Sequence, residues 1–137
     1  MCVFCEIIAA GEKAKAEIVL DEPEVVAFLD VRPVFVGHTL VVPRAHVDTL
    51  LDLPKEMLAP LFGASQRVAK AIEDGLGADG TFVAINNRVS QSVPHLHVHV
   101  VPRRKGDGLR GFFWPRVKYA EGEMAEVGAR IRAALAR

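Results

Sequence analysis

The sequence predicts an α+β fold: a mainly antiparallel sheet of about five strands, one long central helix and a C-terminal helix. Five short stretches have the composition or the alternation of β-strands. Several links between them are too short for the helical crossover that parallel neighbours require. Two longer stretches, residues 54–76 and 121–136, repeat apolar side chains at three- and four-residue steps, as amphipathic helices do.

The first 43 residues predict one short helix and three strands. Apolar side chains in residues 2–10 have a helix-like spacing, and Gly11 ends this stretch. Residues 17–20 and 25–31 read as strands joined by a turn-rich acidic link. After a loop, residues 38–42 form a third predicted strand, which ends before a proline.

The rest of the chain predicts the long helix, two more strands and the last helix. In the helix predicted over 54–76, Pro60 either introduces a kink or marks the true first turn. Asp52 near its start can cap free amides, and Gly75 and Gly77 end it. The predicted strands cover 81–85 and 94–102, with a polar loop at 86–93 between them. The last helix carries an apolar stripe made of Met124, Val127, Ile131, Ala134 and Leu135.

Length and composition favour an ordinary globular protein. A chain of 137 residues is expected to form a single domain over 1–137 with one sizeable core. The formal net charge is zero, which argues against a general nucleic-acid binder. No apolar run approaches the roughly 20 residues of a membrane span, and the first residues lack a signal-peptide pattern. We therefore expect no membrane partner and residence in the cytoplasm.

The most informative stretch is the strand predicted over 94–102. Three of the five histidines, His95, His97 and His99, alternate there with apolar residues. Side chains on a strand alternate between faces, so the histidines are expected on one face and the apolar residues in the core. Alternate residues lie roughly 7 Å apart along a strand, so the three imidazoles cannot all attack one atom. We expect a division of labour in which the central ring is reactive and its neighbours support it. An imidazole near pH 7 can act as a general base, a metal ligand or a nucleophile.

Two neighbouring features add chemistry to this strand. The loop 90–93, Ser-Gln-Ser-Val, offers hydroxyl, amide and backbone donors that can hold phosphate oxygens. Cys2 and Cys5 have the spacing of a zinc knuckle, although a redox pair or two inert thiols fit the spacing equally well. His38, beside Gly37 at a strand start, is expected to be a buried hydrogen-bonding residue rather than a ligand.

The histidine stretch resembles the signature of the histidine triad family, His-φ-His-φ-His-φ-φ with φ apolar. The resemblance runs from about residue 2 to residue 103, most of the chain, with several elements in the family's order. These are Phe-Cys-Glu-Ile-Ile at 4–8, Phe-Leu-Asp-Val-Arg-Pro at 28–33, Gly-His-Thr-Leu-Val-Val-Pro-Arg-Ala-His at 37–46, Asn-Asn at 86–87 and Gln-Ser-Val-Pro at 91–94. It implies a HIT-like fold and nucleotidyl hydrolase or transferase chemistry at an α-phosphate.

The resemblance also implies roles for individual residues. His97 would be the nucleophile that forms a covalent nucleotidyl-histidine, and His99 would contact the phosphate oxygens. Gln91 and Ser92 match positions near the phosphate, and Ser92 would help to protonate the leaving group. Asp30 matches the acid that binds the ribose, since a carboxylate can accept hydrogen bonds from two hydroxyls.

Further matches concern the base and the phosphate loop. The side chains that match the apolar slot for the base are Phe4, Ile7, Phe28, Leu29 and Val31. Ordinary core packing is the alternative for all five, and for Ile7 and Val31 it is about equally good. Asn86 is the best match to the family's phosphate-side amide, but the loop up to Gln91 is two residues shorter than is usual in the family. Ser90 stands where a glycine usually precedes the glutamine.

Some members of the family hold a structural zinc on two cysteines and two histidines. The matching residues here are Cys2, Cys5, His46 and His95. Zinc is therefore the expected cofactor, in a site closed by four protein ligands. The family typically forms homodimers through the sheet and the long helix, and we expect the same here. The aromatic segment Phe112, Phe113 and Trp114 is expected to pack on the sheet or across a dimer rather than to close over the leaving group.

The resemblance implies an enzyme that hydrolyses a purine nucleotide substrate. Nucleoside phosphoramidates and diadenosine polyphosphates are the two candidate substrates, and Ser92 after Gln91 favours the phosphoramidates. Two other classes stay open. One is a hydrolase that uses the alternating histidines as ligands of a catalytic zinc. The other is a nucleotide-binding regulatory protein with weak or no turnover.

Overall fold

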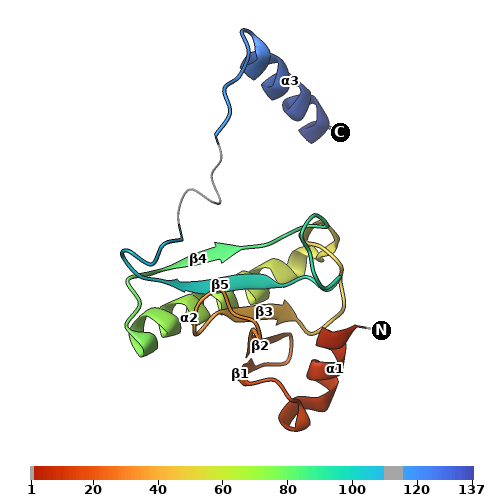
Figure 1. Cartoon of the computed structure of the whole chain (residues 1–137). Helices are drawn as coiled ribbons and strands as arrows, with labels where there is room; N and C mark the ends of the chain where they lie inside the picture. The colour runs from red at the N-terminus through yellow and green to blue at the C-terminus, as the bar shows by residue number, and fades with distance from the viewer. Residues whose placement is uncertain (1, 110–115) are drawn as a thin grey trace. The chain divides into compact units, whose positions relative to one another are not determined.

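The computed structural model describes residues 2–109 and 116–137, and residues 18–103 contain a five-stranded antiparallel sheet (Figure 1). The strand order is β1-β2-β3-β5-β4, and every neighbouring pair is antiparallel. This confirms the predicted α+β class and the number of strands. The strands are β1 (Ile18–Asp21), β2 (Val25–Leu29), β3 (Thr39–Pro43), β4 (Gly80–Ala84) and β5 (Val98–Arg103).

The two faces of the sheet bury separate clusters of apolar side chains. Helix α2 (Leu58–Leu76) covers one face, where Val41, Val98 and Val100 pack against its buried side. Helix α1 (Val3–Ala10) lies at the other face, where Phe4 packs with Val26, Phe28, Leu40 and Val42. Alternation along β2 and β3 supplies one residue to each cluster in turn. The sheet therefore separates the α2 side from the side that carries α1.

Helix α2 begins at Leu58, four residues later than predicted, and Pro60 lies in its first turn, where a missing amide is tolerated. Two 3₁₀ turns precede it, Leu50–Asp52 and Lys55–Met57. Asp52 caps the first of these instead of α2, because its carboxylate accepts from both the amide (3.1 Å) and the hydroxyl (2.7 Å) of Thr49. Gly77 ends α2 in the left-handed conformation, at φ 67°.

The histidine strand is shorter than predicted. Because β5 starts at Val98, only His99 lies within a strand, and His95 and His97 belong to the irregular segment before it. That segment still alternates, since Leu96 and Val98 enter the α2-side core while Phe4 of α1 contacts the rings of His95 and His97. The predicted facing of the three histidines holds, although the strand hydrogen bonds do not extend to the first two.

The described residues fall into two compact units, Met1–Asp107 and Gly108–Arg137. The second unit contains α3 (Glu123–Leu135), which confirms the last predicted helix, and none of the residues of α3 is buried. Its apolar stripe is open, with Met124, Ile131 and Leu135 all more than half exposed. The single domain over 1–137 stays a prediction. Phe112, Phe113 and Trp114 lie outside the described residues.

Within the described part of the chain, no helix is both long enough and apolar enough to cross a lipid bilayer.

Gly37, in the loop before β3, is expected to be intolerant of a side chain. Its φ is 103°, and an added Cβ would lie 2.5 Å from Leu76 Cδ1 and 3.1 Å from Pro102 Cγ. We expect Gly37→Ala to lower the free energy of unfolding by about 1–3 kcal/mol, measured by urea denaturation. Gly63→Ala is the matched control, because this helical glycine has open space around it and should gain about 0.5–1 kcal/mol. Equal effects at both positions would contradict the prediction.

Candidate functional site

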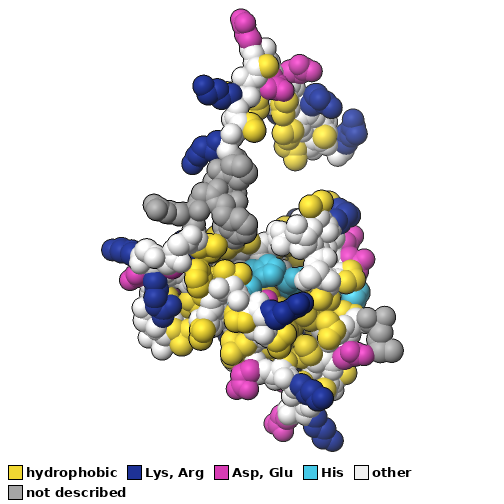
Figure 2. Space-filling model, viewed as in Figure 1, with side chains coloured by type: hydrophobic (Ala, Val, Ile, Leu, Met, Phe, Trp, Pro, Cys, Tyr) yellow, Lys and Arg dark blue, Asp and Glu magenta, His cyan; other side chains and the backbone are white. Residues whose placement is uncertain are grey.

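One cavity of about 350 Å³ lies on the α1 side of the sheet and gathers most of the predicted site residues. Four polar side chains predicted to act on the substrate line it: Asp30, Ser92, His97 and His99. All five side chains predicted for the base slot line it as well: Phe4, Ile7, Phe28, Leu29 and Val31. Figure 2 shows histidine side chains among hydrophobic ones on one face of the molecule. The fold thus joins residues from α1, β2, β5 and the loop before β5.

The ring of His97 is held by the backbone of its neighbour. Its Nδ1 lies 2.7 Å from the carbonyl oxygen of His95, which can only accept a hydrogen bond. Nδ1 therefore carries the proton, and Nε2 keeps a lone pair. Phe4 packs edge-on against this ring, with centroids 5.1 Å apart at 88°. His97 is only 3% exposed, so its ring forms a mostly buried part of the cavity wall.

A chain of hydrogen bonds fixes the tautomer of His99. The backbone amide of Val34 donates to His38 Nδ1 at 3.1 Å, so His38 carries its proton on Nε2. That Nε2 lies 3.0 Å from His99 Nδ1 and donates to it. His99 consequently has its own proton on Nε2, as a hydrogen-bond donor. His38 is buried and hydrogen-bonded as predicted, but its link to His99 is a role that the sequence did not reveal, because 61 residues separate the two.

The surroundings of His99 keep it neutral near pH 7. Burial, followed by repulsion from His97 and His38, lowers the pKa of His99 to about 4, against a smaller opposing effect of Asp30. Burial also lowers the pKa of His38, with Asp30 again opposing. A neutral His99 with a proton on Nε2 can donate to a phosphate oxygen without itself losing or gaining charge.

The depressed pKa of His99 predicts acid sensitivity of the fold. The unfolded chain binds a proton at His99 near pH 6.5, whereas the folded chain resists it until about pH 4. The contribution of neutral His99 to the free energy of unfolding is therefore fully present above pH 6.5 and is lost as the pH falls from 6.5 toward 4. We expect the His99 imidazole resonances to titrate near pH 4, and the urea midpoint to fall less between pH 7.5 and 5 in His99→Asn than in the wild type. A titration midpoint near 6.5 would contradict this.

Asp30 is held at the end of β2 with its carboxylate on the cavity. Its Oδ1 accepts the backbone N–H of Arg32 at 2.9 Å, and Oδ2 lies 3.8 Å from His38 Nε2. Val31, beside it, is 82% exposed, so the core-packing alternative is wrong for this residue. Lys15 and Arg32 also line the cavity. Sequence reasoning missed both, because a single basic residue in a loop has no pattern that separates it from a solvated one.

Two predicted substrate residues, Asn86 and Gln91, are not among the residues that line this cavity. Asn86 is exposed in the loop that follows β4. Gln91 uses both ends of its amide locally: Oε1 accepts from the Arg88 amide at 2.9 Å, and Nε2 donates to the Asp48 carbonyl at 2.5 Å. Ser90, at the position where the family usually has glycine, has a φ of 62°, in the left-handed region that glycine favours. The backbone thus keeps the glycine-like turn although the residue has changed.

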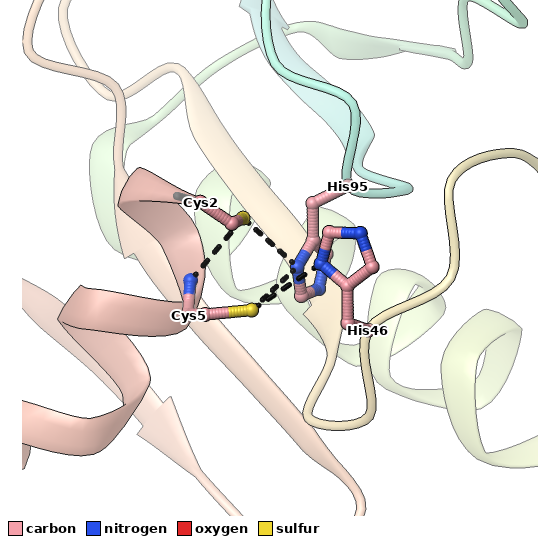
Figure 3. A group of neighbouring side chains, drawn as sticks. All are labelled: Cys2, Cys5, His46 and His95. Carbon is pink, nitrogen blue, oxygen red and sulfur yellow. Dashed lines mark hydrogen bonds between the residues drawn. The ribbon is translucent and has the colours of Figure 1, made fainter.

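The four predicted metal ligands form one cluster, the Cys–His cluster of Cys2, Cys5, His46 and His95 (Figure 3). The N-terminal end of α1 supplies the two sulfurs, one from its N-cap Cys2 and one from Cys5. The segment after β3 supplies His46, and the segment before β5 supplies His95. His95 Nδ1 lies 3.5 Å from both sulfurs, and His46 Nδ1 lies 3.3 Å from the sulfur of Cys5. Tetrahedral zinc with ordinary Zn–S and Zn–N bonds would set such ligand atoms about 3.5 Å apart. The spacing suits one zinc ion.

Outer hydrogen bonds prepare both imidazoles of this cluster as ligands. His95 Nε2 donates to the Pro43 carbonyl at 2.8 Å, and His46 Nε2 donates to the Asp48 carboxylate at 2.9 Å. Each Nδ1 therefore presents a lone pair to the sulfurs. Burial lowers the pKa of His95, which keeps it in the neutral form that binds metal. Burial and the adjacent Cys2 thiol raise the pKa of Cys5, a penalty on the thiolate that a bound dication would remove.

In a second group of side chains of metal-binding type, Asp30, His38 and His99, not every residue presents a lone pair to a metal. Because the Val34 amide donates to His38 Nδ1, the His38 nitrogen that faces the group carries a proton and has no lone pair for a metal. The group is a hydrogen-bond relay. This argues against the alternative of a catalytic zinc held by the histidines of the cavity.

Comparisons with known proteins place this chain among a set of relatives. A family model described as HIT domain matches residues 12–106. An uncharacterized HIT-like protein of Mycobacterium tuberculosis is 46% identical over 110 residues, which cover 79% of this chain and 75% of that protein. The asymmetrical bis(5'-nucleosyl)-tetraphosphatase of Schizosaccharomyces pombe is 39% identical over 104 residues, 74% of this chain and 57% of that enzyme.

One solved structure of a similar protein contains zinc. The crystal structure of a Zn-bound histidine triad family protein from Mycobacterium smegmatis is 41% identical to this chain, with a TM-score of 0.73. The likeness covers 98% of this chain and 93% of that one.

Proposed function

This chain belongs to the HIT family, and from that membership we propose that it is a nucleotide hydrolase acting at the α-phosphate of a purine nucleoside phosphoramidate through a covalent nucleotidyl-histidine on His97. The supporting observation is that a nucleophile with a free lone pair, a neutral donor, a hydroxyl and a carboxylate line one apolar-walled cavity. The relatives include a hydrolase of dinucleoside polyphosphates, which makes these compounds the second candidate substrate.

In the first half of the reaction, Nε2 of His97 attacks the α-phosphorus and the bond to the leaving amine breaks. The proton on Nδ1 stays hydrogen-bonded to the His95 carbonyl, so the ring need not rotate to accept the phosphoryl group. The Nε2–H of His99 donates to a phosphate oxygen as charge grows there. The exposed hydroxyl of Ser92 supplies a proton to the departing nitrogen and regains one from solvent.

In the second half, water attacks the same phosphorus, loses a proton to solvent, and the bond between phosphorus and His97 Nε2 breaks. The products are a nucleoside monophosphate and the free imidazole. The Asp30 carboxylate accepts from the ribose hydroxyls, and the apolar wall of the cavity holds the base. Contact of Gln91 with phosphate requires a change of rotamer, because its amide is engaged with Asp48 and Arg88. Asn86 is exposed and does not line the cavity.

The Cys–His cluster is proposed to bind a structural zinc through Cys2, Cys5, His46 and His95. Bound there, zinc would cross-link α1 to the two segments that carry the histidines. Four protein ligands leave no open position for water, so the metal contributes to the fold and not to the bond cleavage. Residence in the cytoplasm stays a prediction, and it suits thiols that must remain reduced to bind metal.

We also propose that the chain forms a homodimer through the sheet edge and the long helix. Strand β4 is the last strand in the order of the sheet that the described residues form. Val83 on β4 and Leu58 and Phe62 on α2 are each 40% exposed or more, although they are large and apolar. Light scattering on the eluting peak of a sizing column tests this assembly.

Trapping the intermediate tests the enzymatic proposal. Protein mixed with adenosine 5'-phosphoramidate and quenched at alkaline pH is expected to carry one adenylyl group, which peptide mass spectrometry should locate on His97. Diadenosine tetraphosphate, tested in parallel, ranks the two substrate classes by kcat/KM. Binding of AMP without an adduct or turnover on either compound would instead identify a nucleotide-binding regulatory protein.

A further inference from the structure

The segment after β3 and the loop before β5 are joined by three hydrogen bonds outside the sheet. These are Leu96 N–H to Val47 O at 2.7 Å, Gln91 Nε2–H to Asp48 O at 2.5 Å, and Leu50 N–H to Asn87 Oδ1 at 3.0 Å. Each segment also carries one histidine of the Cys–His cluster, His46 in the first and His95 in the second. The segments therefore form one unit that includes half of the proposed metal site.

Asp48 is hydrogen-bonded both to the Cys–His cluster and to the loop before β5. Its carboxylate accepts from Nε2 of His46 at 2.9 Å, and its backbone carbonyl accepts from the amide of Gln91. The other end of Gln91 accepts the Arg88 N–H, which closes the turn 88–91. In that turn Arg88 and Ser90 have φ of 69° and 62°, a conformation that side chains other than glycine adopt at a cost. The side chain of Gln91, which is hydrogen-bonded to Asp48, thus holds this strained turn closed.

We propose that Asp48 couples metal binding at the Cys–His cluster to the conformation of residues 88–92, and so to the position of Ser92 beside the cavity. A metal fixes the ring of His46, the ring orients Asp48, and the Asp48 carbonyl holds the amide of Gln91. Asp48 and Gln91 act here as positioning residues, because they work through His46 and Ser92. This inference rests on the proposed zinc site.

Gln91→Glu separates this link from the rest of the loop. A glutamate keeps the acceptor for the Arg88 amide, but it replaces the donor to the Asp48 carbonyl with a second acceptor. In the wild type, zinc is expected to slow hydrogen–deuterium exchange of the peptide that contains residues 88–92. In Gln91→Glu that zinc-dependent protection should be lost, whereas Gln66→Glu, at an exposed glutamine on α2, should keep it.

Zinc affinity provides the reciprocal measurement, by competition with a chromophoric chelator. Coupling works in both directions, so Gln91→Glu should weaken zinc binding by at least about fivefold. Asp48→Ala, which removes the partner of His46, should weaken it by about 10- to 100-fold. Asp74→Ala, an exposed acid paired with Lys70 on α2, is the control and should leave affinity unchanged.

The outcomes distinguish the coupling from the metal site itself. Zinc binding with wild-type affinity and unchanged loop protection in Gln91→Glu would overturn the coupling and leave the zinc site standing. Unchanged affinity in Asp48→Ala would overturn the role of Asp48. A wild-type protein that binds no zinc at all would overturn the proposed metal site and the coupling with it.

Discussion

His97→Ala is expected to abolish the adduct with adenosine 5'-phosphoramidate and to lower kcat by roughly 10³-fold or more, since covalent catalysis has no other route once the nucleophile is gone. His97 is the cavity imidazole whose Nδ1 is fixed by a backbone carbonyl and whose Nε2 keeps a lone pair. His99 cannot replace it, because its Nδ1 already accepts from His38 and its Nε2 carries the proton. Pre-steady-state and steady-state rates measure the loss.

Folding and binding controls belong to the same experiment. The ring of His97 packs against Phe4, so its removal leaves a small gap in the cavity wall, and thermal unfolding must show that the fold survives. Binding of AMP should fall far less than turnover, because the base and ribose contacts remain. Turnover within tenfold of the wild type would rule out a covalent His97 intermediate.

Removal of metal is expected to lower the melting temperature by about 10 °C. A site saturated at 100 times its dissociation constant adds about 2.7 kcal/mol to the free energy of unfolding, and a chain of this size shifts by about 4 °C per kcal/mol. Cys2 is the N-cap of α1 and Cys5 lies within it, and Phe4 of the same helix packs against His97 and Phe28. Loss of metal should therefore loosen α1 and lower activity without removing any catalytic group.

Cys5→Ser provides the comparison. This variant should melt near the chelated wild type, and chelator should not shift it further. A wild-type melting temperature that is unchanged after exhaustive chelation, with metal loss verified by elemental analysis, would contradict a structural role for the cluster.

The sequence predicted the fold well where periodicity carried the information. Strands β1 to β4 and the three α-helices lie where alternation, apolar spacing and glycine or proline signals indicated, within a few residues. The start of β5 was the main error, because alternating side chains also occur in an extended segment that has no strand partner. His95 donates its amide to Val93 and Leu96 donates to Val47, so that segment takes its hydrogen bonds from loops. A pattern of residue types does not show whether a backbone hydrogen bond will come from a strand or from a loop.

For the site, residue type was a better guide than loop geometry. Asp30, Ser92, His97 and His99 line one cavity, and the four residues of the Cys–His cluster meet, as their residue types had predicted. Gln91 was matched to the phosphate by its neighbours in the sequence, yet the shortened loop turns its amide to Asp48. The relay from His38 to His99 was invisible for another reason: it depends on β3 and β5 being neighbours in the sheet.

His95 performs two tasks with two different chemical groups. Its imidazole belongs to the Cys–His cluster, whereas its backbone carbonyl orients His97. Every amino acid has that carbonyl, so a replacement such as cysteine retains the group that orients the neighbouring ring. In saturation mutagenesis, the substitutions tolerated at position 95 would thus be those that preserve folding and metal binding. The substitutions tolerated at position 97 would be those that preserve the reaction. Two histidines that look equivalent in the motif should therefore have different profiles of tolerated substitutions.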